Sequence, residues 1–132
     1  MAHRIKVISL SRPRVEQGNT VQKPELLRTL SRATNLTEGL VDLVIKELRD
    51  QIIEYNRAGR AVKVEGLGTY APNISLDGTF DLQYRADTAF CHGLNIPGIF
   101  TGTIANRENI GKTGADLVQK WNTENPDDVV VE

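Results

Sequence analysis

The most constraining feature of this 132-residue chain is one long predicted helix whose apolar surface is too wide for a single neighbour. Thr37 is a suitable N-cap for this helix, and Gly59 follows its last turn as a C′ residue. A helix with an apolar face wider than one stripe needs cover on two sides. Its own domain offers one side, and we expect a partner chain to supply the other. The apolar positions are Leu40, Val41, Leu43, Val44, Ile45, Leu48, Ile52, Ile53 and Tyr55.

The residues around this helix predict a mixed α+β fold. A shorter amphipathic helix is predicted over residues 23–34. Apolar and charged residues then alternate over 62–65, which predicts a strand that Gly66-Leu67-Gly68 interrupts. Asp77-Gly78 between two apolar runs is a strong hairpin signal, and a short helix is predicted over residues 87–94.

The two ends of the chain are predicted to add shorter elements. Residues 4–10 are rich in β-branched side chains and predict a strand, and a second strand is predicted within residues 99–106. Thr113 with Asp116 three residues later is typical of a helix start. We therefore expect an N-terminal strand or arm (1–21), a central domain (22–95) and a C-terminal extension with a short helix and an acidic tail (96–132).

The charge is spread unevenly along the chain. Residues 1–35 contain seven Lys and Arg against two Glu, so they carry +5, and the remaining residues carry −6 to give the net charge of −1. A near-neutral total therefore conceals a basic start and an acidic remainder. The net charge of −1 argues against a protein that coats nucleic acid through a basic surface over the whole chain.

The composition excludes several classes of site. A single Cys excludes an internal disulfide framework and a multi-cysteine zinc site. Cys91-His92 with His3 as the other histidine supplies no ligand set for a metal, so we expect a packed cysteine there and no cofactor. No Ser/His/Asp constellation or phosphate-binding Gly-rich loop is present, so we expect neither an enzyme nor a small-molecule substrate. No apolar run approaches the roughly 18 residues of a membrane span, and we expect a cytoplasmic protein without a membrane partner.

One ordered set of residues resembles a known family. The set begins with Lys23-Pro24-Glu25-Leu26-Leu27 and runs through the long helix to Gly59. It continues from Val62 to Tyr70 and includes the Gly66-Leu67-Gly68 turn. These residues are similar to the bacterial histone-like HU and integration host factor proteins. The resemblance implies two N-terminal helices, a three-stranded antiparallel sheet and short C-terminal helices. It also implies a homodimer through the second helix, and a β-ribbon arm that lies in the minor groove of DNA and bends it with a proline wedge.

The chain departs from the family pattern in its arm. The segment between Tyr70 and Phe90 is about ten residues shorter than the family's stretch and has no Arg-Asn-Pro tip. Pro72 lies at the base of this short arm, and Arg85 is the one Lys or Arg between residues 66 and 100. DNA bending by a wedge is therefore expected to be weak or absent. The added ends resemble a divergent HU-like subgroup that carries extra N- and C-terminal segments.

The resemblance implies phosphate contacts at a small set of positions. Each position also has a purely structural interpretation: a tight turn for the glycines, a solvated strand face or helix start for the cations, and edge protection for the N-terminal basic residues. Glu65 would repel a phosphate beside the Gly66 turn. The matching positions are Lys23, Arg60, Lys63, Gly66, Gly68 and Arg85, and the basic start adds Arg4, Lys6, Arg12 and Arg14.

Two functional hypotheses follow. The first is an HU-like architectural protein of the nucleoid that binds double-stranded DNA through phosphate contacts with little sequence preference. The alternative is a structural or protein-interaction module that keeps the HU fold and dimer and has lost DNA binding. The short arm, Glu65 and the pI of about 6.1 favour the alternative.

Overall fold

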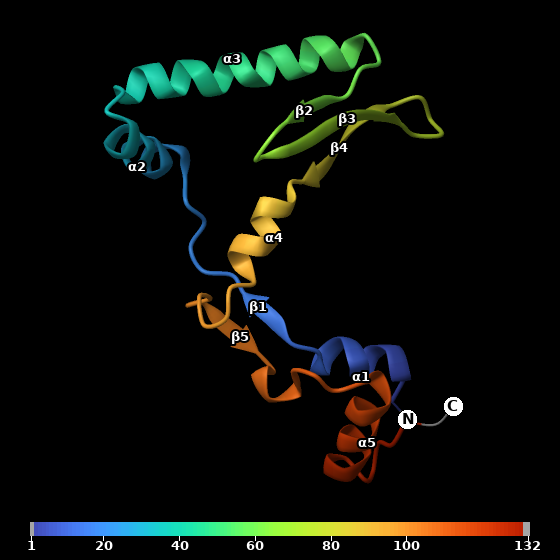
Figure 1. The fold of residues 1–132 in the computed structure, drawn as a ribbon. Helices are drawn as coiled ribbons and strands as arrows, with labels where there is room; N and C mark the ends of the chain where they lie inside the picture. The colour runs from blue at the N-terminus through green and yellow to red at the C-terminus, as the bar shows by residue number, and fades with distance from the viewer. Residues whose placement is uncertain (1, 131–132) are drawn as a thin grey trace. The chain divides into compact units, whose positions relative to one another are not determined.

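The chain divides into two compact units in a computed structural model that describes residues 2–130. The central unit consists of residues 21–100. The end unit combines both ends of the chain, residues 2–20 and 101–130. The central unit is therefore an insertion, in sequence, within the end unit (Figure 1).

The central unit begins with two helices whose bounds match the predicted ones. Helix α2 spans Lys23–Thr34 and helix α3 spans Glu38–Arg57. The Thr37 hydroxyl accepts a hydrogen bond from the Leu40 N–H at 3.2 Å, which confirms Thr37 as the N-cap of α3. Gly59 has φ +78°, the left-handed conformation expected of a C′ glycine.

A three-stranded antiparallel sheet follows, in the order β2-β3-β4. Strand β2 spans Val62–Val64, β3 spans Gly68–Ile74 and β4 spans Phe80–Ala86. Asp77-Gly78 closes the β3–β4 hairpin, and helix α4, Thr88–Leu94, comes directly after β4. The two predicted helices, the strand order and the short hairpin are all present.

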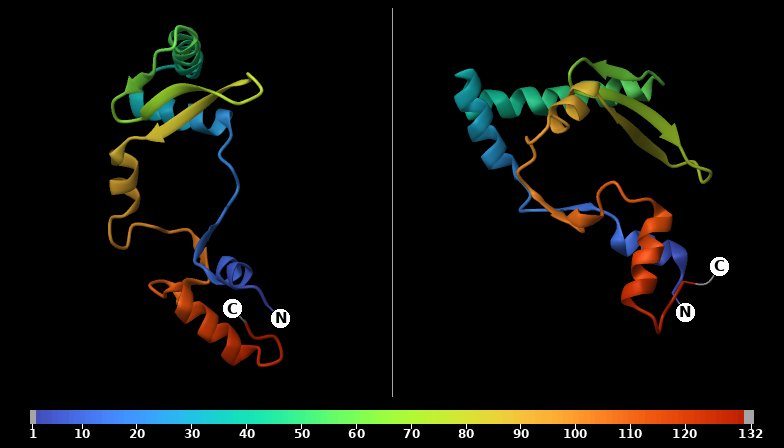
Figure 2. Two further views of the ribbon diagram at one scale, coloured as in Figure 1. Left: turned by 90° about the vertical axis from the view of Figure 1, so that its right-hand side faces the viewer. Right: turned by 60° about the horizontal axis from the view of Figure 1, so that its bottom comes forward.

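Helix α3 lies along one face of the sheet (Figures 1 and 2). Alternation along β3 and β4 places Tyr70, Pro72, Phe80 and Leu82 on this face. Together with the C-terminal half of α3 they line a mainly apolar groove with a volume of about 780 Å³. The opposite face of the sheet therefore carries the polar side chains of the same strands.

The central unit buries little apolar surface within one chain. Among its described hydrophobic side chains, Val41 and Ile52 are buried, and both belong to α3. Leu43 and Val44 on the same helix are each 60% exposed. Soluble domains of this size bury a sizeable apolar core, so this helix face is incomplete as a single chain.

The end unit is built from elements that lie far apart in the sequence. It contains helix α1 (Arg4–Ser11), strand β1 (Arg14–Glu16), strand β5 (Thr103–Ala105), the 3₁₀ turn η1 (Arg107–Asn109) and helix α5 (Gly114–Glu124). Strands β1 and β5 pair antiparallel, and α1 packs against α5 (Figure 1). Thr113 and Asp116 form the predicted start of α5 as a capping box, and the C-cap residue Asn125 precedes Pro126.

The prediction of a strand over residues 4–10 is wrong, because this segment is helix α1. Its β-branched residues favour a strand locally, but packing against α5 determines the outcome. Val7 is 1% exposed and Leu117 of α5 is 4% exposed, and the Ile8 side chain lies against Gly114. Tertiary packing of one face therefore outweighs a weak local preference.

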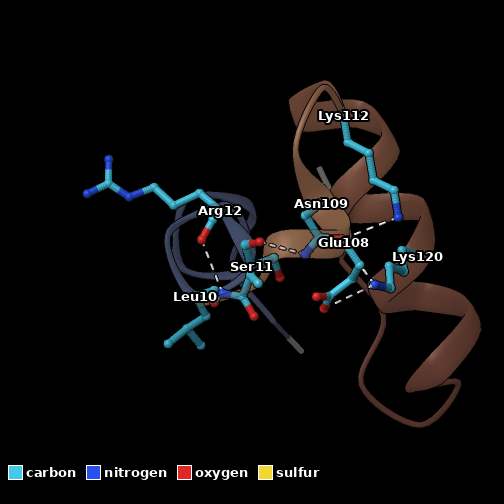
Figure 3. A network of polar contacts seen from close by, with 8 residues as sticks. Leu10, Ser11, Arg12, Glu108, Asn109, Lys112 and Lys120 are labelled. Atoms are coloured by element: carbon cyan, nitrogen blue, oxygen red, sulfur yellow. Dashed lines mark hydrogen bonds and ion pairs between the residues drawn. The ribbon is translucent and has the colours of Figure 1, made fainter. Parts of the chain in front are cut away.

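Two asparagine side chains hold the C-terminal end of α1 (Figure 3). Asn106 donates to the carbonyl oxygens of Leu10 and Arg12, at 2.7 and 3.1 Å. The buried Asn109 donates to the carbonyl oxygen of Ser11 at 2.6 Å. Carbonyl groups at a helix end have no partner within the helix, so these side chains replace a local cap.

Candidate nucleic-acid interface

The strand register places two candidate cations in one row across the sheet. Lys63 of β2 pairs with Thr69 of β3, and Thr69 pairs in turn with Arg85 of β4. Directly opposed residues in an antiparallel sheet extend from the same face. Because the other face lies against α3, the row Lys63–Thr69–Arg85 belongs to the open, polar face.

A polar hollow lies on this open face beside the row. Thr69, Ala71, Gln83, Tyr84 and Arg85 line it, and its volume is about 570 Å³. Lys63 and Arg85 are exposed, and no salt bridge occupies either of them within residues 2–130. The carboxylate of Asp87 partly offsets the charge of Lys63 through space, and both cations remain exposed to an external anion.

The turn between β2 and β3 is held by an acidic side chain. The Gly66 N–H donates to Asp87 Oδ2 at 3.2 Å, and the Ala89 N–H donates to Asp87 Oδ1 at 2.9 Å. These hydrogen bonds, the one from Ala89 foremost, lower the pKa of Asp87 below its ordinary value. The Gly66 N–H therefore already has a partner, which favours the tight-turn interpretation of this glycine over a phosphate contact.

The close approach of two strands explains why residue 68 is a glycine. Its φ is +151°, and a Cβ there would lie 2.8 Å from Tyr84 Cε1 and would overlap the Arg85 carbonyl oxygen. The Tyr84 hydroxyl also donates to the Leu67 carbonyl oxygen at 2.8 Å. Strands β3 and β4 therefore approach too closely at Gly68 to leave room for a side chain.

Lys23 does not present a free charge at the start of α2. Its Nζ forms a salt bridge with Asp42 Oδ1 on α3, and Lys46 Nζ lies 3.0 Å from Asp42 Oδ2. The hydrogen bond from Lys23 is the main cause of the lowered pKa of Asp42, followed by that from Lys46. Two cations share one carboxylate here, so a net positive charge still lies at this corner of the two helices.

Arg60 stacks on an aromatic ring. Its guanidinium carbon lies 5.3 Å from the centroid of the Tyr55 ring, at the end of α3. This cation–π arrangement orients the guanidinium without neutralising it.

The four N-terminal cations are parts of the folded end unit. Arg4 and Lys6 lie on α1, Arg12 is its C-cap residue, and Arg14 is the first residue of β1. The expectation of an extended N-terminal strand for Arg4 and Lys6 is therefore corrected to a helix.

The structure adds Arg107, which the sequence interpretation missed. It lies two residues after Ala105, which pairs with Arg14, so the pairing of β5 with β1 brings its backbone to the same end of the ribbon as Arg14.

The described chain offers no metal site and no membrane span. Within residues 2–130, no group of three His, Cys, Asp or Glu side chains could hold a metal ion. Cys91 is exposed on α4, so the expectation of a packed cysteine is wrong for the single chain. Over the same residues, no helix is long and apolar enough to cross a membrane.

The comparison with known families agrees with this geometry. A family model described as an HU domain fused to wHTH, Ig, or glycine-rich motif matches residues 9–88, which is more than half of the chain. The chain belongs to this family. The predicted HU-like α+β fold and the predicted relationship to HU-like proteins with added segments are both confirmed.

The match includes the complete two-helix and three-strand arrangement of the central unit and extends into the end unit as far as residue 9. The HU-like region thus contains the row of Lys63, Thr69 and Arg85. No protein in a search of curated sequences matches the chain.

Proposed function

We propose that this chain is an architectural protein that binds double-stranded DNA as a homodimer, through phosphate contacts and with little sequence preference. Membership of an HU-like family supports DNA binding in general. The proposal includes no catalytic residue, cofactor, metal or small-molecule substrate, and it places the protein at the nucleoid in the bacterial cytoplasm.

The observation that carries the proposal is the cross-strand row on the open face of the sheet. Lys63 and Arg85 extend from the same face through their shared partner Thr69, and within residues 2–130 neither forms a salt bridge with a carboxylate. Two exposed cations on one face can contact the phosphates of a DNA backbone. Arg60 is a further candidate contact, and Lys23 contributes through the net positive charge that it and Lys46 leave around Asp42.

The homodimer is proposed because α3 lacks cover. Leu40, Leu43 and Val44 are half exposed or more, and the apolar groove between α3 and the sheet has no occupant in one chain. A second copy of the same helix would bury these side chains, and apolar burial contributes about 25 cal/mol per Å². The resemblance to HU proteins points to the same helix.

A second candidate function is a protein-interaction module that keeps the fold and the dimer. Specific observations favour it: Lys23 is bound by Asp42, the Gly66 N–H is bound by Asp87, and Glu65 is exposed beside this turn. Two of the expected phosphate contacts, Lys23 and Gly66, are thereby weakened or blocked, and Glu65 adds a negative charge beside the second.

The experiment that decides between the two is a fluorescence titration of labelled duplex DNA at a series of salt concentrations. The wild-type chain should bind several unrelated duplexes with similar affinity, and log K should fall linearly with log[salt]. The variant Lys63→Ala/Arg85→Ala should bind more weakly to all duplexes and show a smaller slope, by about 0.9 for each phosphate that the variant no longer neutralises.

A matched control removes the same charge elsewhere in the central unit. The variant Arg28→Ala/Arg32→Ala changes two exposed arginines of α2 and should keep the wild-type slope. Absence of binding at low salt, or an affinity that does not change with salt, would refute DNA binding and support the protein-interaction module.

A further inference from the structure

Three exposed arginines gather at one end of the ribbon formed by β1 and β5. Arg14 pairs with Ala105 in the last rung of the antiparallel ladder. Arg12 precedes this rung by two residues, and Arg107 follows it by two residues as the first residue of η1. The two segments touch directly here, because the Asn106 side chain donates to the Arg12 carbonyl oxygen at 3.1 Å. Arg12 lies at the bend after α1, and Arg14 begins β1 two residues later, so the backbones of both residues lie at the same end of the ribbon.

These arginines carry charges that the described part of the end unit does not neutralise. Within residues 2–130, no salt bridge involves Arg12, Arg14 or Arg107. Two acidic residues lie near them in sequence. Glu16 is two residues after Arg14 on β1 and forms no salt bridge within residues 2–130, and Glu108, beside Arg107, lies 3.8 Å from Lys120 Nζ. Figure 3 shows the Arg12 side chain extending away from the polar network that contains Glu108 and Lys120.

The backbone that carries the arginines is firmly held. Asn106 and Asn109 bond three successive carbonyl groups at the end of α1, including that of Arg12. Pro13, between Arg12 and Arg14, restricts its own φ. A cation on rigid backbone loses less conformational freedom when it binds an anion than a cation on a flexible arm does.

We propose that Arg12, Arg14 and Arg107 form a second surface on this chain that binds the phosphates of duplex DNA. The proposal rests on the DNA-binding function above and extends it to the end unit, outside the three-stranded sheet. Guanidinium groups suit this role because their planar N–H donors match phosphate oxygens in two-point contacts. The surface would add affinity and salt dependence without sequence preference, since phosphates are the same in every sequence.

The test compares the full-length chain with the variant Arg12→Gln/Arg107→Gln, which keeps a long polar side chain at both positions and removes two charges. In a duplex titration at several salt concentrations, the variant should bind at least about five-fold more weakly. Its slope of log K against log[salt] should be smaller by about 0.9 for each phosphate that the variant no longer neutralises. The control Arg28→Gln/Arg32→Gln removes the same charge from α2 and should retain the wild-type slope.

The outcomes separate the two proposals. If the wild type binds duplex DNA and the Arg12/Arg107 variant has the same affinity and slope, the second surface is refuted and the sheet surface stands. If the wild type does not bind at low salt, the DNA-binding function itself fails. The variant Arg14→Gln/Arg107→Gln is a second test that leaves Arg12, the C-cap residue of α1, unchanged.

Discussion

Gly68 in β3 lies so close to Arg85 in β4 that a Cβ at Gly68 would overlap the Arg85 carbonyl oxygen. The same Cβ would lie 2.8 Å from Tyr84 Cε1, and the φ of +151° is itself unfavourable for any other residue. We expect Gly68→Ala to destabilise the central unit by about 2 kcal/mol or more, because backbone atoms must move to relieve the overlap. Urea denaturation of the purified variant measures this.

Gly39 is the matched control for this prediction. It lies in α3, and a Cβ there would meet nothing within 4 Å. Gly39→Ala should leave stability unchanged or raise it by up to about 1 kcal/mol, since alanine favours the helix. Equal effects of the two substitutions would contradict the close approach of β3 and β4.

The hairpin tip contains an acid-sensitive carboxylate. Asp77 Oδ1 accepts hydrogen bonds from Ser75 Oγ at 2.5 Å and from the Thr79 N–H at 2.9 Å. The bond from Ser75, followed by that from Thr79, lowers the pKa of Asp77 to about 2. Because the folded-state pKa lies below the unfolded value of about 3.9, the stabilisation is complete above that value and is lost as the pH falls through about 2.

Asp77→Ala should therefore lower the melting temperature at pH 6, and the difference from wild type should shrink as the pH approaches 2. Melting curves of both proteins at intervals over this pH range provide the measurement. A difference that stays constant down to pH 2 would show that the carboxylate charge is not what stabilises the turn.

The stability of the end unit depends on hydrogen bonds of the Asn109 side chain. Its side chain donates to the Ser11 carbonyl oxygen at 2.6 Å and accepts from Lys120 Nζ at 3.0 Å, and the residue is 4% exposed. Asn109→Ala should cost about 1–3 kcal/mol, because it leaves a carbonyl group at the end of α1 without its partner. Hydrogen exchange should show faster exchange in α1 and α5 and unchanged exchange in α3. Loss of protection in α3 as well would contradict the independence of the two units.

The exposed face of α3 predicts the dimer. The Leu43 side chain is 60% exposed in one chain and would be buried in the proposed dimer. Leu43→Asp would place a charge in this buried interface, which is unfavourable. Sedimentation velocity at micromolar concentration should show a dimer for wild type and a monomer or an unfolded chain for the variant. Leu76→Asp is the control, because Leu76 lies at the exposed hairpin tip and should leave the dimer intact.

The elements that local signals define were predictable from the sequence. Thr37 caps α3, Gly59 ends it with a positive φ, and Asp77-Gly78 closes the hairpin, each as expected from neighbouring residues alone. Helix α1 was not predictable in this way. Its residues favour a strand, and its partner α5 begins more than 100 residues later, at Gly114.

The candidate site residues also separate into those that local signals predict and those that only tertiary contacts reveal. The positions of Lys63 and Arg85 followed from the alternation of their strands, whereas the bonds of Asp87 to Gly66 and of Asp42 to Lys23 join residues with no local signal between them. Arg107 had no motif around it, and only the pairing of β1 with β5 gives it neighbours.

The order of helices and strands in the central unit and the over-wide apolar face of α3 could be read from the residues alone, because caps, turns and periodicity act over a few residues. The three-dimensional fold was needed to show that the two ends form one unit, that Gly66 and Lys23 already have acidic partners, and that Arg12, Arg14 and Arg107 lie at the same end of the ribbon of β1 and β5. These features depend on contacts between residues about 20 to 100 positions apart, whose formation is governed by packing and register rather than by local preference.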